Sequence, residues 1–194
     1  MPNLMAFLSY ILITTFTPGP NVIMSMTNAA KYGVKKSLPF NIGVFIGFTI
    51  IMILSSIFSI TLISVVPSIK PIMSYIGAIY ILYMAWKIYK SKPNSHTDND
   101  KATTSIISGL LLQFINPKVI LFCITTVTTF IIPYYRSPIY LFIFSVSIAF
   151  TGFIATLCWA LFGSIFQKFI VKNDRIVNAI MALLLVYCAF SLLL

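Results

Sequence analysis

Charged side chains are scarce in this 194-residue chain: they make up 8% of its residues, against 59% that are apolar. Because soluble domains carry about 25% charged residues, this composition excludes a water-soluble globular enzyme. A mean hydropathy of +1.01 equally excludes a disordered chain. It also excludes a soluble nucleic-acid binder, although the net charge is +10. We therefore expect no nucleic-acid partner.

Groups that carry redox, metal or acid-base chemistry are also missing. The three cysteines, Cys123, Cys158 and Cys188, stand singly, without a C-x-x-C motif or a pairing with histidine. This pattern indicates packing residues rather than a redox motif, a disulfide scaffold or a metal site. The only histidine, His96, lies beside Asp98 in a polar stretch and is interpreted as a solvated loop residue. We expect no enzyme activity, no metal and no cofactor.

Long apolar runs are what the chain does contain. Roughly 20 helical residues cross a bilayer core of about 30 Å, so the length allows about six crossings with short loops. The gaps between charges predict helices near 4–26, 39–64, 70–89, 104–131, 138–164 and 175–193. The first run lacks the basic residues of a secretion signal and is longer than one, so we expect it to be retained as a span. The prediction is an all-α polytopic membrane protein surrounded by lipid.

The basic residues indicate how these spans are oriented. One side of the membrane receives the loops after the first, third and fifth helices, with ten basic residues: Lys31, Lys35, Lys36, Lys87, Lys90, Lys92, Lys101, Lys168, Lys172 and Arg175. The opposite side has only Lys70 and Arg136. Because Lys and Arg are retained in cytoplasmic loops, both termini are predicted on the non-cytoplasmic side.

The two halves of the chain share one pattern. Pro20 and Pro117 lie 97 residues apart, and each marks a polar break in the first helix of its half. Three helices per half is an odd number, so the second copy must enter the membrane from the opposite face. Inverted repeats of this kind are common among secondary transporters. We predict a first three-helix repeat over 1–90, a polar cytoplasmic linker over 91–103 and a second repeat over 104–194.

The broken first and fourth helices predict a polar site near the bilayer midplane. Proline supplies no N–H and displaces the carbonyl four residues earlier, so the carbonyls of Thr14, Phe16 and Gln113 are released. Freed carbonyls are tolerated in a bilayer only inside protein or along a wet cavity, and the following half-helix presents positive N–H groups. Simple kinks are the alternative. The candidate substrate-binding residues are Thr17, Pro18, Gly19, Pro20, Asn21, Gln113, Asn116, Pro117 and Lys118, with Asn41 as a further donor and acceptor.

Lys118 is the one basic residue that topology does not explain. A cation in the middle of a span costs about 2.5–3.5 kcal/mol on insertion scales, and none of the six predicted spans contains an Asp or Glu to pair with it. It therefore needs water, carbonyls or an anionic ligand. A snorkelling side chain is the alternative, but Lys118 lies far from both expected interfaces. We predict that it binds a substrate carboxylate.

Gly43 and Gly47 form a G-x-x-x-G pattern in the second predicted helix. Small residues at this spacing let two helix backbones approach closely. We expect this contact inside the bundle. A homodimer face is the alternative, and the oligomeric state stays open.

Five motifs together resemble the LysE/RhtB family of bacterial amino-acid exporters, the lysine and homoserine-threonine efflux type. They are Thr17-Pro-Gly-Pro-Asn21, Gly43-x-x-x-Gly47, Gly77-x-x-Tyr-x-Leu82-Tyr-x-Ala-Trp86, Phe114-x-Asn-Pro-Lys118 and Trp159, and they span essentially the whole chain. The resemblance implies an inner-membrane carrier that exports amino acids or close derivatives, driven by the proton gradient. The chain departs from carriers that use a membrane carboxylate for protons, because its predicted spans contain none.

The sequence thus predicts a secondary transporter with a small amino acid as substrate. A neutral side chain is favoured, since the spans offer no acid to balance a cationic one. The alternative function is efflux of a divalent cation or other small ion, which would require acidic or histidine ligands in the membrane. The sequence leaves open which amino acid is carried, the coupling ion, and the residues around the substrate side chain.

Overall fold

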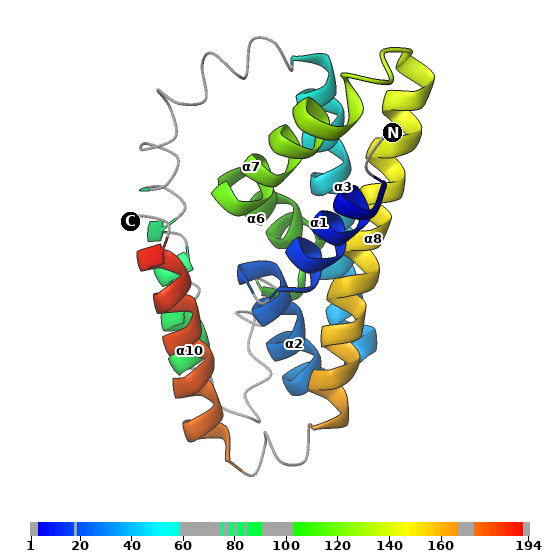
Figure 1. The fold of residues 1–194 in the computed structure, drawn as a ribbon. Coiled ribbons are helices and arrows are strands. Elements are labelled where there is room, and N and C mark those ends of the chain that lie inside the picture. Colours follow the sequence, from blue (N-terminus) through cyan, green and yellow to red (C-terminus); the bar gives the residue numbers. More distant parts are fainter. Residues whose placement is uncertain are drawn as a thin grey trace.

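The computed structural model describes residues 4–17, 19–58, 75, 78–79, 81–83, 85–90, 103–166 and 173–191, and no strand occurs among them. Its helices, shown in Figure 1, are α1 (Leu4–Phe16), α2 (Pro20–Tyr32), α3 (Val34–Ile57), α6 (Ile106–Ile115), α7 (Pro117–Thr125), the π-helix η1 (Thr126–Ile131), α8 (Pro138–Ile165) and α10 (Asp174–Ser191). The described residues between 75 and 90 are helical too. The all-α prediction is confirmed for this part of the chain.

Several predicted features lie outside the described residues. These are Pro18, Lys70, Gly77, Tyr80, His96, Lys168, Lys172 and the linker 91–103 except Thr103.

Prolines fix where three of the helices begin. Pro20, Pro117 and Pro138 occupy the first turn of α2, α7 and α8, where a missing N–H costs no hydrogen bond and the fixed φ suits a helix. The predicted helices 4–26 and 104–131 are therefore each divided at the proline-containing break. The break between α6 and the segment Pro117–Ile131 bends the chain by 66°.

The predicted loop after the first helix is wrong. The expected edges were residues 26 and 39, but α2 continues to Tyr32 and α3 begins at Val34, so only Gly33 lies between them. Gly33 has a φ of 82°, a conformation that glycine adopts without steric cost. A single residue thus reverses the chain, and Lys31, Lys35 and Lys36 belong to helix ends rather than to a loop.

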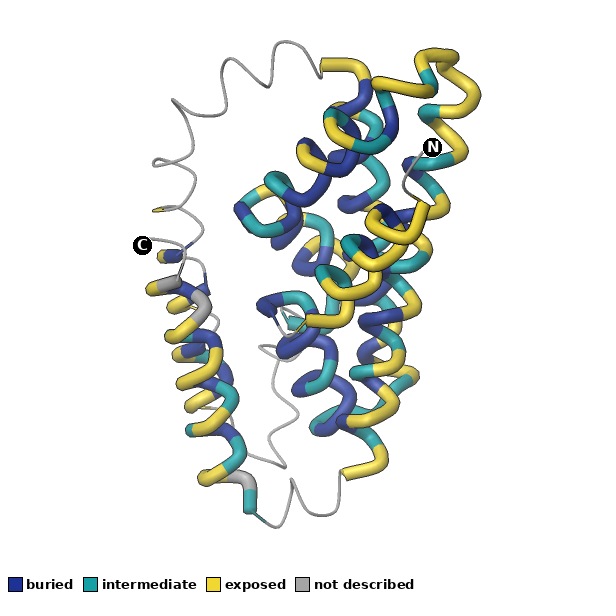
Figure 2. The backbone as a smooth tube through the Cα atoms, in the orientation of Figure 1, coloured by how far each residue is buried: buried dark blue, intermediate teal, exposed yellow. Residues whose placement is uncertain are grey.

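Two clusters of buried apolar residues hold the helices together. One joins α2, α3, α6 and α10 to the described helical residues Ala78, Ile81, Ala85 and Ile88, through side chains such as Met24, Phe40, Leu112 and Leu185. The other joins α1, α3, α7, η1 and α8. Figure 2 shows the buried residues facing inward and the exposed ones facing outward along most helices. The exposed residues include many large apolar side chains, among them Leu54, Phe142 and Leu161, and apolar surface of this extent is typical of contact with lipid.

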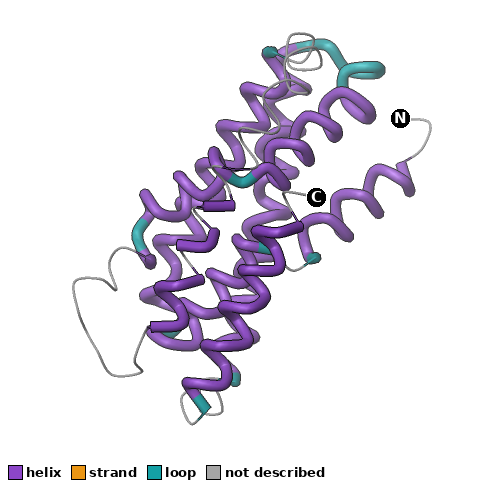
Figure 3. The backbone as a smooth tube through the Cα atoms, turned by 90° about the vertical axis from the view of Figure 1, so that its left-hand side faces the viewer, coloured by secondary structure: helices purple, strands orange, loops and turns teal. Residues whose placement is uncertain are grey.

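Helix length and hydropathy agree with a membrane location. Val34–Ile57 and Pro138–Ile165 are each long and apolar enough to cross a bilayer, and the bent pair Ile106–Ile115 and Pro117–Ile131 can form a third span. Figure 3 shows that the connections between helices are short where their residues are described, as between α2 and α3 and between α6 and α7. The described residues supply two or three spans of this kind, and the arrangement of six spans as an inverted repeat stays a prediction.

Glycines bring α3 and α6 into backbone contact. A Cβ atom added to Gly43 would overlap the carbonyl oxygen of Ile106, and one added to Gly109 would overlap that of Phe40. The backbones therefore approach as closely as they do in small-residue helix pairs of membrane proteins. This confirms the prediction that the Gly43-x-x-x-Gly47 pattern permits a close contact within the bundle.

Replacing Gly43 by valine is expected to destabilise the fold by about 3 kcal/mol, at the upper end of overpacking costs, because the obstacle is backbone rather than a movable side chain. The measurements are the amount of folded protein in the membrane fraction and the unfolding midpoint in detergent. Ile46→Ala is the matched control, since Ile46 lies on the same helix and is 38% exposed. An unchanged midpoint for Gly43→Val would show that α3 and α6 can separate without cost.

Candidate functional site

The break between α1 and α2 offers backbone carbonyls to side chains of other helices. The helix α1 ends at Phe16, and Gly19 is the extended N-cap of α2. The carbonyl of Phe16 accepts a hydrogen bond from Trp159 Nε1 at 3.2 Å, and that of Thr17 accepts one from Lys118 Nζ at 3.1 Å. Side chains from α8 and α7 therefore bind the carbonyls at the end of α1.

The break between α6 and α7 is built around Asn116, which caps both helices. Its N–H donates to the carbonyl of Gln113 at 3.4 Å, and its Oδ1 accepts from the N–H of Lys118 at 3.1 Å. Pro117 is buried and stands at the first position of α7. The asparagine thus satisfies polar backbone groups that a bilayer could not.

A cluster of three buried or half-buried amides links the two breaks. Asn21 Nδ2 donates to Gln113 Oε1 at 2.8 Å, and Gln113 Nε2 donates back to Asn21 Oδ1 at 3.1 Å. Asn116 Nδ2 also donates to Asn21 Oδ1, at 3.4 Å. Gln113 and Asn116 are almost fully buried. Because unpaired amides are costly in a low-dielectric interior, this amide cluster (Asn21, Gln113 and Asn116) fixes the start of α2 against α6 and α7.

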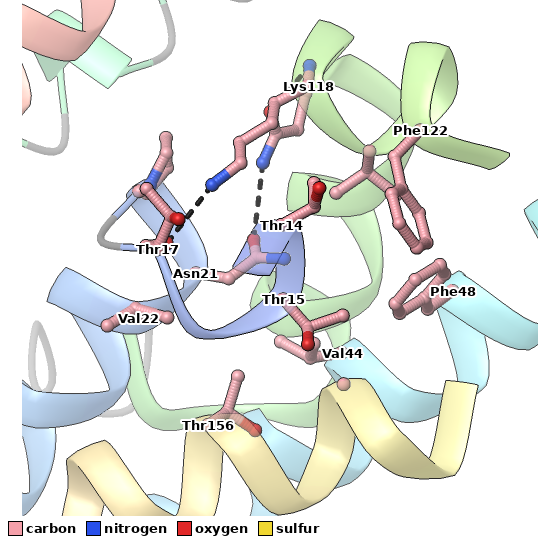
Figure 4. A pocket seen from close by; sticks show the side chains of 15 residues that line it. Thr14, Thr15, Thr17, Asn21, Val22, Val44, Phe48, Lys118, Phe122 and Thr156 are labelled. Atoms are coloured by element: carbon pink, nitrogen blue, oxygen red, sulfur yellow. Dashed lines mark hydrogen bonds between the residues drawn. The ribbon is translucent and has the colours of Figure 1, made fainter. Parts of the chain in front are cut away.

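A cavity of about 50 Å³ lies beside this cluster. One water molecule needs roughly 10–15 Å³ measured in the same way, so the cavity has room for several waters or a small polar molecule. Its two ends differ in chemistry. Figure 4 shows the Lys118 ammonium and Thr17 on one side, and the rings of Phe48 and Phe122 on the other.

The charged end of the cavity is strongly electropositive. Lys118 occupies the second position of α7, where the helix dipole is positive. Its ammonium also lies against the start of α2, since a Cβ built on Gly19 would be 3.3 Å from Lys118 Nζ. Gly19 gives the N-terminus of α2 no side-chain cap. The cation and the uncapped N-terminus of α2 therefore favour an anionic group at this end.

The structure gathers most of the predicted site residues at the cavity. Those that line it are Thr17, Gly19, Pro20, Asn21, Asn116 and Lys118. Gln113 does not line it, but contacts it through Asn21. Pro117 forms the buried start of α7, and Pro18 lies outside the described residues. Asn41 is also absent from the lining, because its Oδ1 accepts a hydrogen bond from Ser25 at 2.7 Å between α2 and α3.

Thr14, whose carbonyl was predicted to be released at the first break, also lines the cavity. The remaining lining residues were not among the predicted site residues: Thr15, Val22, Val44, Phe48, Val119, Phe122, Gly152 and Thr156. Of these, Gly152 had a signal, as a glycine inside an apolar span. Phe48 and Phe122 are indistinguishable in sequence from other core aromatic residues. Thr156 can be identified as a cavity residue only once α8 is known to pack beside α2.

Within the described residues, no group of three or more His, Cys, Asp or Glu side chains could hold a metal ion. The polar groups at the cavity are amides, hydroxyls, carbonyls and one ammonium. Such a set binds a small zwitterion or anion through hydrogen bonds and charge.

Comparison with known proteins agrees with this chemistry. The family model described as "LysE type translocator" matches residues 12–194. The "Cysteine/O-acetylserine efflux protein" of Klebsiella pneumoniae is 39% identical over 184 residues, which cover 95% of this chain and 93% of that protein. The protein of the same description from Escherichia coli K12 is 37% identical over 186 residues, covering 96% of this chain and 95% of that protein. No solved structure matches.

The resemblance inferred from the motifs is therefore confirmed by both kinds of comparison. The family's members are multi-pass inner-membrane efflux proteins of bacteria, and its amino-acid efflux relatives are transporters rather than enzymes. This chain belongs to the LysE-type translocator family.

Proposed function

We propose that this chain exports cysteine, O-acetylserine or a close neutral analogue from the cytoplasm, through the cavity between its two broken helices. The observation that carries the proposal is the Lys118 ammonium, held 3.1 Å from the Thr17 carbonyl at the junction of those helices. The substrate class is supported by the cysteine/O-acetylserine efflux proteins that align with nearly the whole chain.

The substrate carboxylate binds at the electropositive end. Lys118 supplies the full charge and the α2 N-terminus adds partial charge, so a carboxylate there replaces the weaker neutral acceptor, the Thr17 carbonyl. Asn21 and Asn116 line the same end and orient the bound group through their amides. Removal of an anion from this end lets Lys118 return to Thr17.

The substrate ammonium requires a carbonyl acceptor beside the carboxylate subsite. Of the three carbonyls released by proline, those of Phe16 and Gln113 already accept hydrogen bonds from Trp159 and Asn116. Thr14 lines the cavity, and Pro18, four residues later, has no N–H to donate to its carbonyl. We therefore assign the ammonium to the Thr14 carbonyl.

Transport follows from movement of one half of the chain against the other. In the proposed cycle, six spans form two inverted triples with both termini outside the cytoplasm, and the breaks at Gly19 and Asn116 act as hinges. The substrate enters from the cytoplasm, and rocking then opens the outer face. The proton gradient drives export, and Lys118 is the candidate carrier of the coupled proton.

Flux measurements in proteoliposomes test this function. Vesicles containing the purified protein are preloaded with labelled cysteine, O-acetylserine, lysine or a divalent cation, with and without a pH gradient. We expect the two neutral amino acids to leave at least about tenfold faster than lysine, because the described part of the cavity offers no acid to a cationic side chain. A cation flux without amino-acid flux would instead support the ion-efflux alternative, and flux unaffected by the pH gradient would remove proton coupling.

A further inference from the structure

The apolar end of the cavity is closed by two aromatic rings. Phe48 on α3 and Phe122 on α7 meet edge to face, with ring centroids 5.7 Å apart and planes at 68°. Both side chains are about 95% buried. Figure 4 shows the two rings next to each other, away from the Lys118 ammonium. A substrate held by its charged groups at Lys118 would therefore direct its side chain toward these rings.

The Phe122 ring is held in place from behind. Tyr10 of α1 stacks on it, with centroids 5.4 Å apart and planes at 14°. Tyr10 in turn stacks on Phe130, at 5.6 Å. Phe122 therefore forms the fixed part of the cavity wall. The distance from Lys118 to the apolar end can change only if the Phe48 ring moves.

The position of the Phe48 ring depends on Gly152 of α8. A Cβ atom added to Gly152 would lie 2.6 Å from Cε1 and 2.9 Å from Cδ1 of Phe48. Real carbon atoms do not approach so closely, so the ring would have to move. The backbone of Gly152 has no positive φ, which means that the glycine is required for space and not for its conformation.

The direction of that movement follows from the surrounding packing. Phe48 belongs to a buried apolar cluster together with Ile51, Met52 and Ala149. Protein interiors are close-packed, so displacement into these neighbours is costly. The cavity lies on the open side, since both Gly152 and Phe48 line it. A side chain at position 152 would push the ring into the space that the substrate needs.

We propose that Gly152 and Phe48 together form a size filter that sets how long a substrate side chain the cavity accepts. This inference rests on the proposed export of small neutral amino acids. Cysteine has one heavy atom beyond its Cβ, whereas O-acetylserine has four. The longer side chain must use the space beside Phe48, which the shorter one leaves empty.

The expected effects differ between the two substrates. Gly152→Ala should reduce O-acetylserine export about tenfold and change cysteine export less than about twofold, because a difference of one methylene in an apolar pocket discriminates about 10- to 200-fold. Phe48→Leu should widen the same end and raise export of S-propylcysteine, a longer neutral amino acid, relative to cysteine. The double variant should recover O-acetylserine export, since the smaller side chain removes the clash.

The experiment measures initial export rates of all three amino acids in proteoliposomes, normalised to inserted protein, for the two single variants and the double variant. Thr151→Ala is the matched control: it is the neighbour of Gly152 on α8, its hydroxyl binds only the Ser147 carbonyl at 3.0 Å among the contacts described, and it does not line the cavity. Its substrate ratio should equal that of the intact protein.

The outcomes separate the filter from the function on which it rests. If the intact protein exports both substrates but Gly152→Ala reduces them equally and Phe48→Leu does not restore them, the filter is wrong while the function stands. If the intact protein exports neither, the proposed function fails and the filter with it. Should Gly152→Ala fail to insert, an unchanged ratio of S-propylcysteine to cysteine in Phe48→Leu overturns the filter by itself.

Discussion

Replacing Lys118 by methionine is expected to reduce cysteine export about 10- to 100-fold. The methionine keeps the length and apolar stem of the side chain but removes the ammonium that would bind the substrate carboxylate. A hydrogen bond to a charged group contributes about 1.5–3 kcal/mol, which corresponds to that loss in rate. The measurement is the initial rate of efflux from preloaded proteoliposomes, normalised to the amount of inserted protein.

The stability of Lys118→Met should change little. The variant loses the hydrogen bond to the Thr17 carbonyl, but it also removes a cation from the N-terminus of α7, where the helix dipole disfavours positive charge. The lost hydrogen bond to a charged group costs about 1.5–3 kcal/mol. Removing a cation that is disfavoured both by the helix dipole and by its place within a span returns a similar amount, so the two contributions are opposite in sign. An unchanged unfolding midpoint together with lost transport would therefore place the effect on substrate binding.

Two further lysine variants separate charge from position. Lys118→Arg keeps the charge but exchanges a compact ammonium for a planar guanidinium, so partial export is expected. Lys90→Met removes a cation that lies 4.3 Å above the Trp86 ring and outside the cavity, and it should export normally. Full export by Lys118→Met would contradict the proposed carboxylate subsite and favour a snorkelling role for Lys118.

The parts of the site that depend on local chemistry could be predicted from the sequence. Proline removes a donor wherever it stands, so Pro20 and Pro117 indicated both helix breaks without any knowledge of packing. Lys118 was recognisable in the same way, because a charge within an apolar span is costly anywhere. The structure places Lys118 beside the break of the other half of the chain, as expected if the two breaks face each other.

The parts that depend on tertiary packing could not be predicted. Phe48 and Phe122 are two among 17 phenylalanines, and only the contact of α3, α7 and α8 distinguishes them. Asn41 shows the opposite error: as a polar residue in an apolar span it suggested the site, yet it binds Ser25. The helix edges near Gly33 were missed because lysines were read as loop residues, whereas long basic side chains also occur at helix ends.

Replacing Asn21 by leucine is expected to impair both stability and export. Asn21 exchanges two hydrogen bonds with Gln113 and accepts a third from Asn116. The leucine leaves Gln113 Oε1 and Asn116 Nδ2 without these partners in a buried site, at about 1–3 kcal/mol for each group. We expect a clearly lower unfolding midpoint in detergent and at least tenfold slower export of cysteine.

The matched control is Asn28→Leu on the same helix. Asn28 is buried and donates one hydrogen bond to the Thr103 carbonyl at 2.8 Å, and it does not line the cavity. The free energy of unfolding of this variant should fall by the contribution of one hydrogen bond. The molecules that insert into the membrane should export cysteine at the normal rate. Equal loss of export per inserted molecule in both variants would show that any weakening of α2 blocks transport.

The double variant Asn21→Leu and Gln113→Leu separates the structural role of the amide cluster from its role in transport. Apolar side chains at both positions leave no unpaired Gln113 amide. The double variant should therefore lose less free energy of unfolding than the two single variants lose in sum, by about 0.5–3 kcal/mol. Export should not recover, because Asn21 lines the cavity and Gln113 does not. Recovery of both properties would show that the Asn21 and Gln113 amides serve packing alone and that transport does not need them.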